Sequence, residues 1–187
     1  MRISLSVFTL VLTTVAWAGA SEEVTGFRGV AWGTPFAQVE STVKAWTAEP
    51  RLPLECRTHG GGTTCHGWMT VGPVREASAL VLFLAEQGFA EVALSASTAA
   101  FETFEAMLVE RYGPPTRVLD TVITTTAGGS LPNRQLLWQT GIGQVALIRH
   151  SASDARRTSL VIQSAARVAS VQATHQKQLR EGARTGF

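Results

Sequence analysis

The residues best suited to chemistry lie in one stretch, CRTHGGGTTCHGW, which runs from Cys56 to Trp68. Thiolate and imidazole are ligands that zinc prefers in proteins. Four residues could supply them: Cys56, His59, Cys65 and His66. The spacing is unusual for such a site, because adjacent side chains such as Cys65 and His66 seldom turn toward one ion. A small hydrolase or zinc-dependent enzyme centred on this loop is therefore an alternative interpretation.

The same stretch also fits a covalently closed hairpin. His59-Gly60-Gly61-Gly62 resembles the oxyanion loop of lipase-like hydrolases, but that chemistry also needs a G-x-S-x-G turn, which the sequence lacks. In an exported protein, two cysteines close in sequence normally oxidise to a disulfide. We therefore predict a Cys56–Cys65 disulfide, with the glycines at the tip of a hairpin. Closing so short a loop should stabilise the fold by roughly 2–3 kcal/mol.

Other motifs with chemical potential fail in their context. GIGQVA, Gly141 to Ala146, matches part of a dinucleotide-binding fingerprint, but it runs into the strand-like QVALIRH and the next acid, Asp154, follows too soon. The chain has one tyrosine and no zinc-protease, P-loop, C-x-x-C or haem-attachment motif. We therefore predict no catalytic residues, no cofactor and no enzymatic activity.

The N-terminus has the pattern of a secretory signal peptide over residues 1–20. Arg2 precedes an apolar run from Ile3 to Val15, and Ala18-Gly19-Ala20 offers a cleavage site of small residues. The run is shorter than the roughly 20 residues that span a bilayer, and no cysteine follows it for lipidation. We therefore predict export to the periplasm or beyond, with no integral membrane segment in the mature chain.

The charge of the mature chain does not indicate nucleic acid as a partner. Removing Arg2 leaves 15 of 16 basic residues against 14 acidic ones, so the net charge falls from +2 to +1. The basic residues are scattered and form no phosphate-binding stripe. Near the C-terminus, only Glu181 accompanies four cations: Arg167, Lys177, Arg180 and Arg184. We interpret that end as a solvated tail, with an acidic partner or anionic lipid as the alternative.

The first half of the chain predicts one helix followed by strands. Thr34 provides an N-cap and Pro35 a first helical residue. Apolar residues then recur at helical spacing as far as Trp46, so the helix should end near Ala48. Four segments read as strands, the last two joined by the turn Glu86-Gln87-Gly88: LECRT, CHGWMTV, ALVLFLA and FAEVALS.

The second half repeats this order. Thr98 could cap a helix that carries Phe101, Phe104, Leu108 and Tyr112 and ends at Gly113. Four strand-like segments follow, separated by turn formers at 128–133, 141 and 151–154: TRVLDTVITT, RQLLWQT, QVALIRH and TSLVIQS. Residues 165–181 predict a closing helix.

These elements predict an α+β fold with two layers, an antiparallel sheet with helices packed on one face. Strands joined by such short connections must pair antiparallel, and helices on one face are the simplest covering. The domain would span residues 21–164, in two similar halves at about 34–97 and 98–164, with a C-terminal helix and tail over 165–187. Trp32, Trp46 and Trp138 are expected between helices and sheet.

A resemblance supports this arrangement. The opening FRGVAWGTPFAQVEST resembles the start of many small exported bacterial proteins of unassigned function. The doubled order of helix then strands is similar to the architecture of the β-lactamase inhibitory proteins and of small outer-membrane assembly lipoproteins. Such families imply protein binding in the envelope rather than catalysis. This chain lacks the lipidated cysteine of the assembly lipoproteins.

The sequence therefore predicts an exported, soluble, non-enzymatic protein that binds or assembles another envelope or extracellular protein. The helix-free face of the sheet would carry the contact. Exposed aromatic side chains often mark such surfaces, so Trp68 and Trp138 are the candidate contacts.

Overall fold

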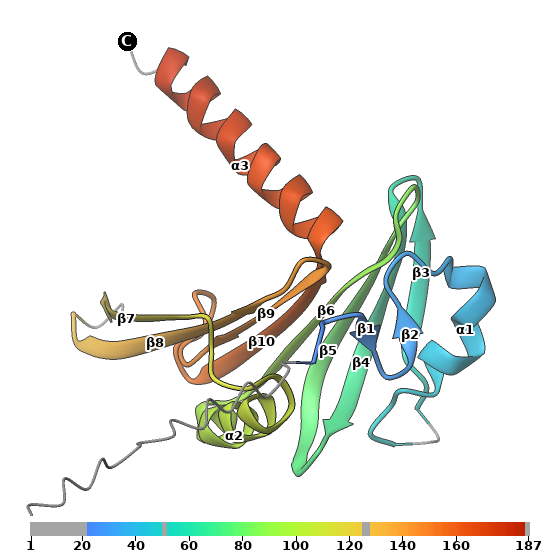
Figure 1. Ribbon diagram of the computed structural model, residues 1–187, viewed down its shortest axis with the longest axis horizontal. Coiled ribbons are helices and arrows are strands. Elements are labelled where there is room, and N and C mark those ends of the chain that lie inside the picture. The colour runs from blue at the N-terminus through green and yellow to red at the C-terminus, as the bar shows by residue number, and fades with distance from the viewer. Residues whose placement is uncertain (1–21, 50–51, 125–127, 186–187) are drawn as a thin grey trace, which may run out of the picture.

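Eight strands form one antiparallel sheet (Figure 1). The computed structural model describes residues 22–49, 52–124 and 128–185, so the predicted signal peptide lies outside the described residues. The strand order is β3-β4-β5-β6-β10-β9-β8-β7. The bounds are β3 (Glu55–His59), β4 (Gly62–Val71), β5 (Val74–Leu84), β6 (Gly88–Ser97), β7 (Arg117–Thr124), β8 (Ser130–Gln139), β9 (Gly143–Ile148) and β10 (Arg157–Ser164).

The remaining elements are three helices and a small hairpin. The hairpin pairs β1 (Gly26–Phe27) with β2 (Val30–Ala31). The helices are α1 (Phe36–Lys44), α2 (Phe101–Tyr112), which follows the 3-10 turn η1 (Thr98–Ala100), and α3 (Ala165–Thr185). The predicted α+β fold with an antiparallel sheet is confirmed. Within the described residues, no helix is both long and apolar enough to cross a membrane.

The sheet consists of two four-stranded meanders, each preceded by a helix. β6 pairs with β10 over seven residue pairs, from Arg157↔Ser97 to Gln163↔Glu91, and this seam joins the two meanders. In Figure 1 the sheet bends at the seam, with α1 outside the β3–β6 limb and α2 below the β7–β10 limb.

One face of the sheet packs against α1 and α2. Burial alternates along β10, where Leu160 and Ile162 are buried while Val161 is only partly so. The α2 side chains that reach this face are all buried: Phe101, Phe104, Leu108 and Tyr112. Their spacing of three or four residues per turn places them on one side of the helix. The helix layer and this face share one hydrophobic core.

Aromatic contacts dock the N-terminal segment onto the core. The Phe89 ring lies 5.2 Å from Phe83, 5.9 Å from Trp46 and 4.8 Å from Trp32, centroid to centroid. Backbone hydrogen bonds from Gly33 N to Phe89 O (2.9 Å) and from Phe89 N to Thr34 O (2.8 Å) hold the same junction. α1 is thereby fixed against the start of β6.

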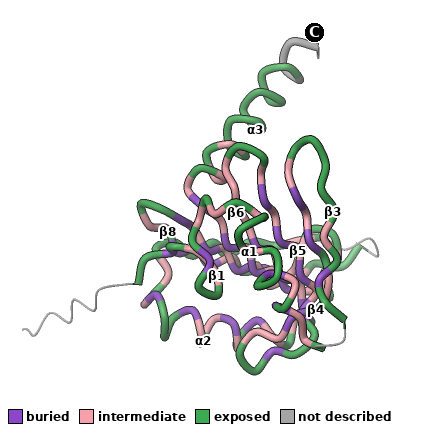
Figure 2. The backbone as a smooth tube through the Cα atoms, turned by 90° about the vertical axis from the view of Figure 1, so that its right-hand side faces the viewer, coloured by how far each residue is buried: buried purple, intermediate pink, exposed green. Residues whose placement is uncertain are grey.

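α3 begins on the opposite side of the sheet and then leaves it. Figures 1 and 2 agree that α2 and α3 extend from opposite sides. The Arg167 guanidinium binds Glu91 at 2.8 Å, so Arg167 does not belong to the solvated tail that we predicted. Residues 171–181 are exposed, which agrees with a solvated helix beyond its first turns.

Several predicted boundaries were wrong by a few residues. α1 ends at Lys44, because the chain then turns to bury Trp46, and Lys44 O accepts from Leu54 N. The cap before α2 is Ser97, whose hydroxyl accepts from Ala99 N, since a 3-10 turn precedes the helix. The N-cap of α1 is Pro35.

The turn predicted over 128–133 is also corrected, because β8 already begins at Ser130. Asn133 is a turn former by composition, but here its side-chain amide bonds the backbone of His150 in both directions, at 3.2 and 2.9 Å. It therefore extends the β8–β9 pairing by side-chain hydrogen bonds.

Gly88 offers a test of the α1 docking. Its φ is +60°, and a Cβ there would lie 2.2 Å from Gly33 O. Gly29, in the turn between β1 and β2, also has a positive φ, +81°, with open space around it. The positive φ alone should cost an alanine roughly 1–2 kcal/mol. We expect Gly88→Ala to lower the free energy of unfolding by about 1–3 kcal/mol more than Gly29→Ala, because overpacking adds to the backbone strain. Urea denaturation measures both, and equal losses would contradict the close approach.

Candidate functional site

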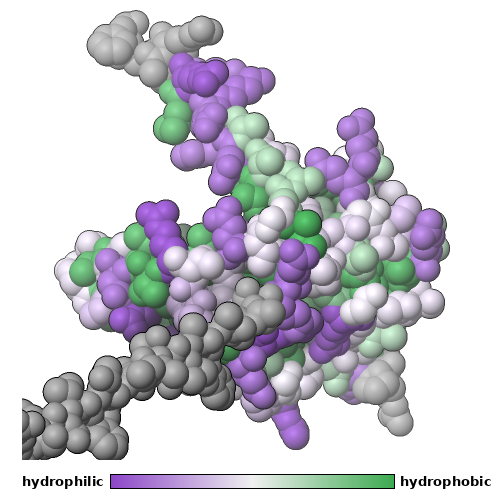
Figure 3. All heavy atoms as spheres, viewed as in Figure 1, coloured by the Kyte–Doolittle hydropathy of each residue, from purple (hydrophilic) through white to green (hydrophobic). Residues whose placement is uncertain are grey.

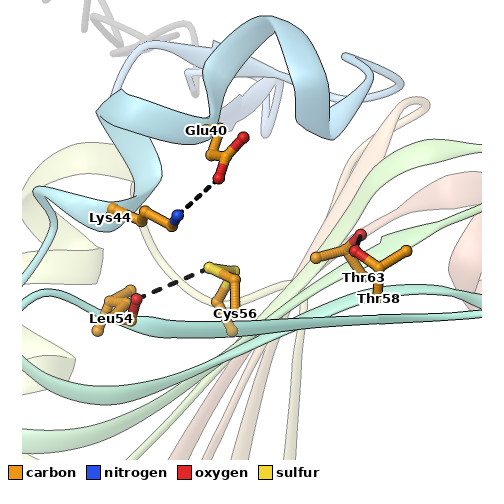
Figure 4. The surroundings of a disulfide bond; sticks show 7 residues. Glu40, Lys44, Leu54, Cys56, Thr58 and Thr63 are labelled. Carbon is orange, nitrogen blue, oxygen red and sulfur yellow. Dashed lines mark hydrogen bonds and ion pairs between the residues drawn. A yellow bond between two sulfur atoms is a disulfide. The ribbon is translucent and has the colours of Figure 1, made fainter.

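The hairpin that holds the cysteines has the predicted form. Cys56 on β3 lies directly opposite Cys65 on β4, and their sulfur atoms are 2.05 Å apart, as in a disulfide bond. Gly60 and Gly61 make the turn between the strands. Figure 4 shows the bond beneath α1, close to the Lys44–Glu40 ion pair of that helix. The predicted disulfide pairing is confirmed.

The alternative zinc site is not assembled. Side chains of successive strand residues point to opposite faces, so Cys65 is buried toward α1 while His66 is exposed on the other face. His59 is also exposed, beside the glycine turn. The disulfide occupies both sulfur atoms. Among the described residues, no three His, Cys, Asp or Glu side chains are placed to share a metal ion.

The GIGQVA segment does not open a helix. β9 begins at Gly143, and Thr140 N donates to Gly143 O at 2.9 Å across the turn. The segment is therefore the turn and first strand residues of the β8–β9 hairpin, as the alternating pattern predicted.

The side of the sheet opposite α1 and α2, here called the open face, presents side chains in cross-strand rows. The central row consists of apolar side chains, with one polar residue at each end. Strand register aligns Leu80, Ala93, Val161, Ala146 and Leu137 from β5 to β8, with His66 at one end and Arg117 at the other. The five apolar members are half-buried although neither α1 nor α2 covers this side.

Polar rows flank the apolar row. On one side Ser78, Ser95 and Ser159 align between Trp68 and Ile148. On the other side, Glu91 aligns with Gln163 and Gln144. The first turn of α3 contacts this last row, because Arg167 Nε donates to Glu91 at 2.8 Å. Gln163 Nε2, within the row, donates to the same carboxylate at 3.0 Å. The apolar and serine rows are therefore the accessible part of the open face.

A groove of about 1200 Å³ lies at the β4 end of the open face. The segments that line it are residues 47–49 and 52–53, the start of β3, the middle of β4 and the first half of β5. Ala48 N donates to Trp68 O at 2.7 Å, and Thr47 Oγ1 donates to Leu52 O at 2.6 Å. These bonds fix the connecting segment against β4 and so form one wall of the groove.

The groove lining combines apolar side chains, including Trp68 and Leu52, with an excess of acidic ones. Three carboxylates line it, Glu49, Glu55 and Glu76, against the single guanidinium of Arg75. Glu76 has a φ of +54°, at the point where pairing between β4 and β5 shifts register. Such a bulge changes the direction in which neighbouring side chains point. Arg75 and Glu76, although adjacent in sequence, therefore both line the groove. This excess of carboxylates in the groove lining favours a cationic ligand.

Arg28 protects the outer edge of β4 next to the groove. Its guanidinium donates to Thr70 O and lies 5.5 Å from the centre of the Phe27 ring. Partial burial lowers the pKa of Arg28 from its ordinary value.

The structure separates the two candidate tryptophans. Trp68 is 53% exposed and lines the groove on the open face. Trp138 is 2% exposed, and its indole donates to Gly113 O at 2.8 Å. The prediction that Trp138 is a partner contact was therefore wrong. Its other predicted position, between helices and sheet, is confirmed, and so is that of Trp46.

The groove also brings together residues that could perform acid–base chemistry. Glu55 lies directly opposite His66, and Ser78 lies on the next strand. Within the part of the chain that the structure describes, no hydrogen bond joins His66 to either residue. The arrangement lacks the hydrogen-bonded nucleophile and base that covalent catalysis uses. An exposed indole among carboxylates suits binding.

Sequence reasoning missed most of the groove. Glu49, Leu52, Glu55, Arg75 and Glu76 come from separate segments and share no motif. The strand register and the folding of the segment before β3 onto β4 place them around Trp68, and no local sequence pattern predicts either.

Comparison with known protein families, with curated proteins and with solved structures gives no significant match. The resemblance in element order to inhibitory and assembly proteins therefore stays a prediction.

The disulfide can be tested by replacing both cysteines. We expect the double variant Cys56→Ser/Cys65→Ser to lose roughly 2–3 kcal/mol in free energy of unfolding, because an unfolded chain without the loop gains conformational entropy. Urea denaturation under oxidising conditions measures the loss. Reduced wild type should match the double variant. Two titratable thiols in the purified oxidised protein, or bound zinc in proportion to protein, would contradict the account.

Proposed function

We propose that the protein is an exported, non-enzymatic module that binds another protein of the cell envelope through its open face, with Trp68 as the main anchor. The exposed indole of Trp68, beside a groove of about 1200 Å³, is the observation that carries the proposal. The signal-peptide pattern of residues 1–20 and the disulfide support export.

The chemistry of the open face suits a protein partner. Protein interfaces commonly combine an apolar centre with a polar rim. Here the apolar row from Leu80 to Leu137 lies beside the serine row, which Trp68 begins. Serine hydroxyls both donate and accept hydrogen bonds. The Arg157 guanidinium donates to Ser95 Oγ at 2.7 Å and to Ser95 O at 2.6 Å, so this row offers a partner hydroxyl groups together with one positive charge.

The groove indicates what the partner presents. An apolar side chain could pack on the Trp68 ring, and a neighbouring lysine or arginine would meet the carboxylates of Glu49, Glu55 and Glu76. Cations also bind the faces of indole rings. A segment that combines apolar and basic side chains therefore fits the groove better than an acidic one.

The test is capture of the partner from native envelope by the tagged mature protein, followed by mild crosslinking and mass spectrometry. With the partner in hand, Trp68→Ala should weaken binding by roughly thirtyfold, because loss of an interface tryptophan typically costs about 2 kcal/mol or more. The thermal midpoint should stay at the wild-type value, since the side chain is largely exposed.

The matched control is Val109→Ala, an exposed apolar position on α2, on the other side of the sheet. It should leave binding unchanged. Equal binding by wild type and Trp68→Ala, or equal weakening by both variants, would remove the open face from the proposal.

A further inference from the structure

One edge of the sheet is a long, exposed strand. β7 is the last strand in the sheet order, and among the residues that the structure describes it pairs with β8 alone. Seven of its eight residues are exposed, and Ile123 is half-buried. An edge strand presents unpaired backbone N–H and C=O groups, and natural proteins usually block such edges with charges, proline or short length.

β7 carries apolar side chains on both faces. Val118 and Val122, 47% and 67% exposed, lie on the side of the helices, while Leu119 and Ile123 lie on the open face. Its charged residues are Arg117, at the start, and Asp120, which pairs with Arg134 of β8 at 2.8 Å. The second half of the strand, from Thr121 to Thr124, has no charge.

The opposite edge is shorter and is covered in part by other segments. β3 has five residues, includes Glu55 and Arg57, and is linked to β4 by the disulfide. Where β4 continues beyond β3, Ala48 N binds Trp68 O and Arg28 binds Thr70 O. These features hinder strand addition at that edge, whereas no segment among the described residues pairs with the outer side of β7.

We propose that β7 pairs antiparallel with β7 of a second copy of this chain across a two-fold axis. A two-fold axis perpendicular to the sheet leaves equivalent side chains of the two copies on the same face. Because directly opposite residues must also point to one face, the axis has to pass between one residue and its own copy. An axis at Thr121 places Leu119 opposite Ile123, twice, on the open face, and Asp120 opposite Val122. An axis at Asp120 would pair the same number of residues but set two carboxylates face to face, which destabilises strand pairing.

The β7 sequence complements itself when the axis passes at Thr121, and this makes a second copy of the chain a suitable partner for the strand. Apolar and β-branched cross-strand pairs stabilise antiparallel strands, and the Thr121 axis supplies two such pairs and a threonine–threonine pair from one sequence. A two-fold interface uses the same patch on both subunits. The open faces of the two copies would lie on the same side of a continuous sheet.

This dimer is independent of the proposed function. The Trp68 groove lies near the β3 end of the strand order, at the opposite end from β7. Both grooves would therefore remain free in the dimer.

Sedimentation velocity of the mature protein over a wide range of concentration is the first test. We expect a reversible monomer–dimer equilibrium. Leu119→Lys should raise the dimer dissociation constant by at least about tenfold, because it removes both Leu119–Ile123 pairs and brings charge to the edge. The matched control is Ile142→Lys, at an exposed turn position, which should dimerise like wild type. A monomer at every concentration, or equal loss in both variants, would overturn the proposal.

Crosslinking tests the register itself. Both native cysteines are in the disulfide, so a single added thiol reports only on the interface. Directly opposite side chains are close enough for a disulfide. Thr121→Cys should therefore form a covalent dimer on oxidation, whereas Asp120→Cys and Leu119→Cys should not. Dimers that crosslink through Asp120→Cys but not Thr121→Cys would overturn the register.

Discussion

The pairing of β6 with β10 is the interaction on which the rest of the structure depends. Each four-stranded meander could form by local hairpins, but only the seam joins them into one sheet. On the helix side, Leu94 faces Leu160 and Val92 faces Ile162 across the seam, all buried in the shared core. On the open face Ala93 faces Val161, which makes the apolar row continuous. The continuous apolar row of the open face therefore depends on the strand pairing that joins residues most distant in sequence.

Local chemistry made much of this fold predictable. Hydrophobic spacing identifies α1 and α2, and cysteines nine residues apart behind a signal-peptide pattern identify the disulfide. Short connections between strands require antiparallel pairing. Each of these inferences depends on residues close in sequence, whose interactions do not need the rest of the fold.

The features that sequence reasoning missed are set by tertiary packing. Trp68 and Trp138 lie in similar strand patterns, yet one is exposed and the other buried, because only the β7–β10 limb places Trp138 against α2 and Gly113. The groove needs the segment after α1 to fold back on β4. α3 has the composition of an ordinary closing helix, but after its Arg167 contact it projects from the body. Its side chains are more apolar near the body and mostly hydrophilic toward the free end (Figure 3).

The two faces of the sheet thus have different physical roles. One face is buried under helices and supplies stability, while the other is half-buried, mixed in polarity and ends at an exposed tryptophan. A face that serves no contact would be expected to carry polar side chains throughout, because antiparallel sheets exposed on one side alternate apolar and polar residues. The apolar row on the open face departs from that expectation, and this departure supports the proposed binding of a partner there.

The most direct test is site-specific photocrosslinking in living cells, with the photoreactive side chain placed at Ser159 in the centre of the open face or at Val109 on α2. The account predicts a discrete adduct with another envelope protein from Ser159 and none from Val109. An adduct from Val109 alone would place the interface on the helices and contradict the assignment of the open face as the binding surface.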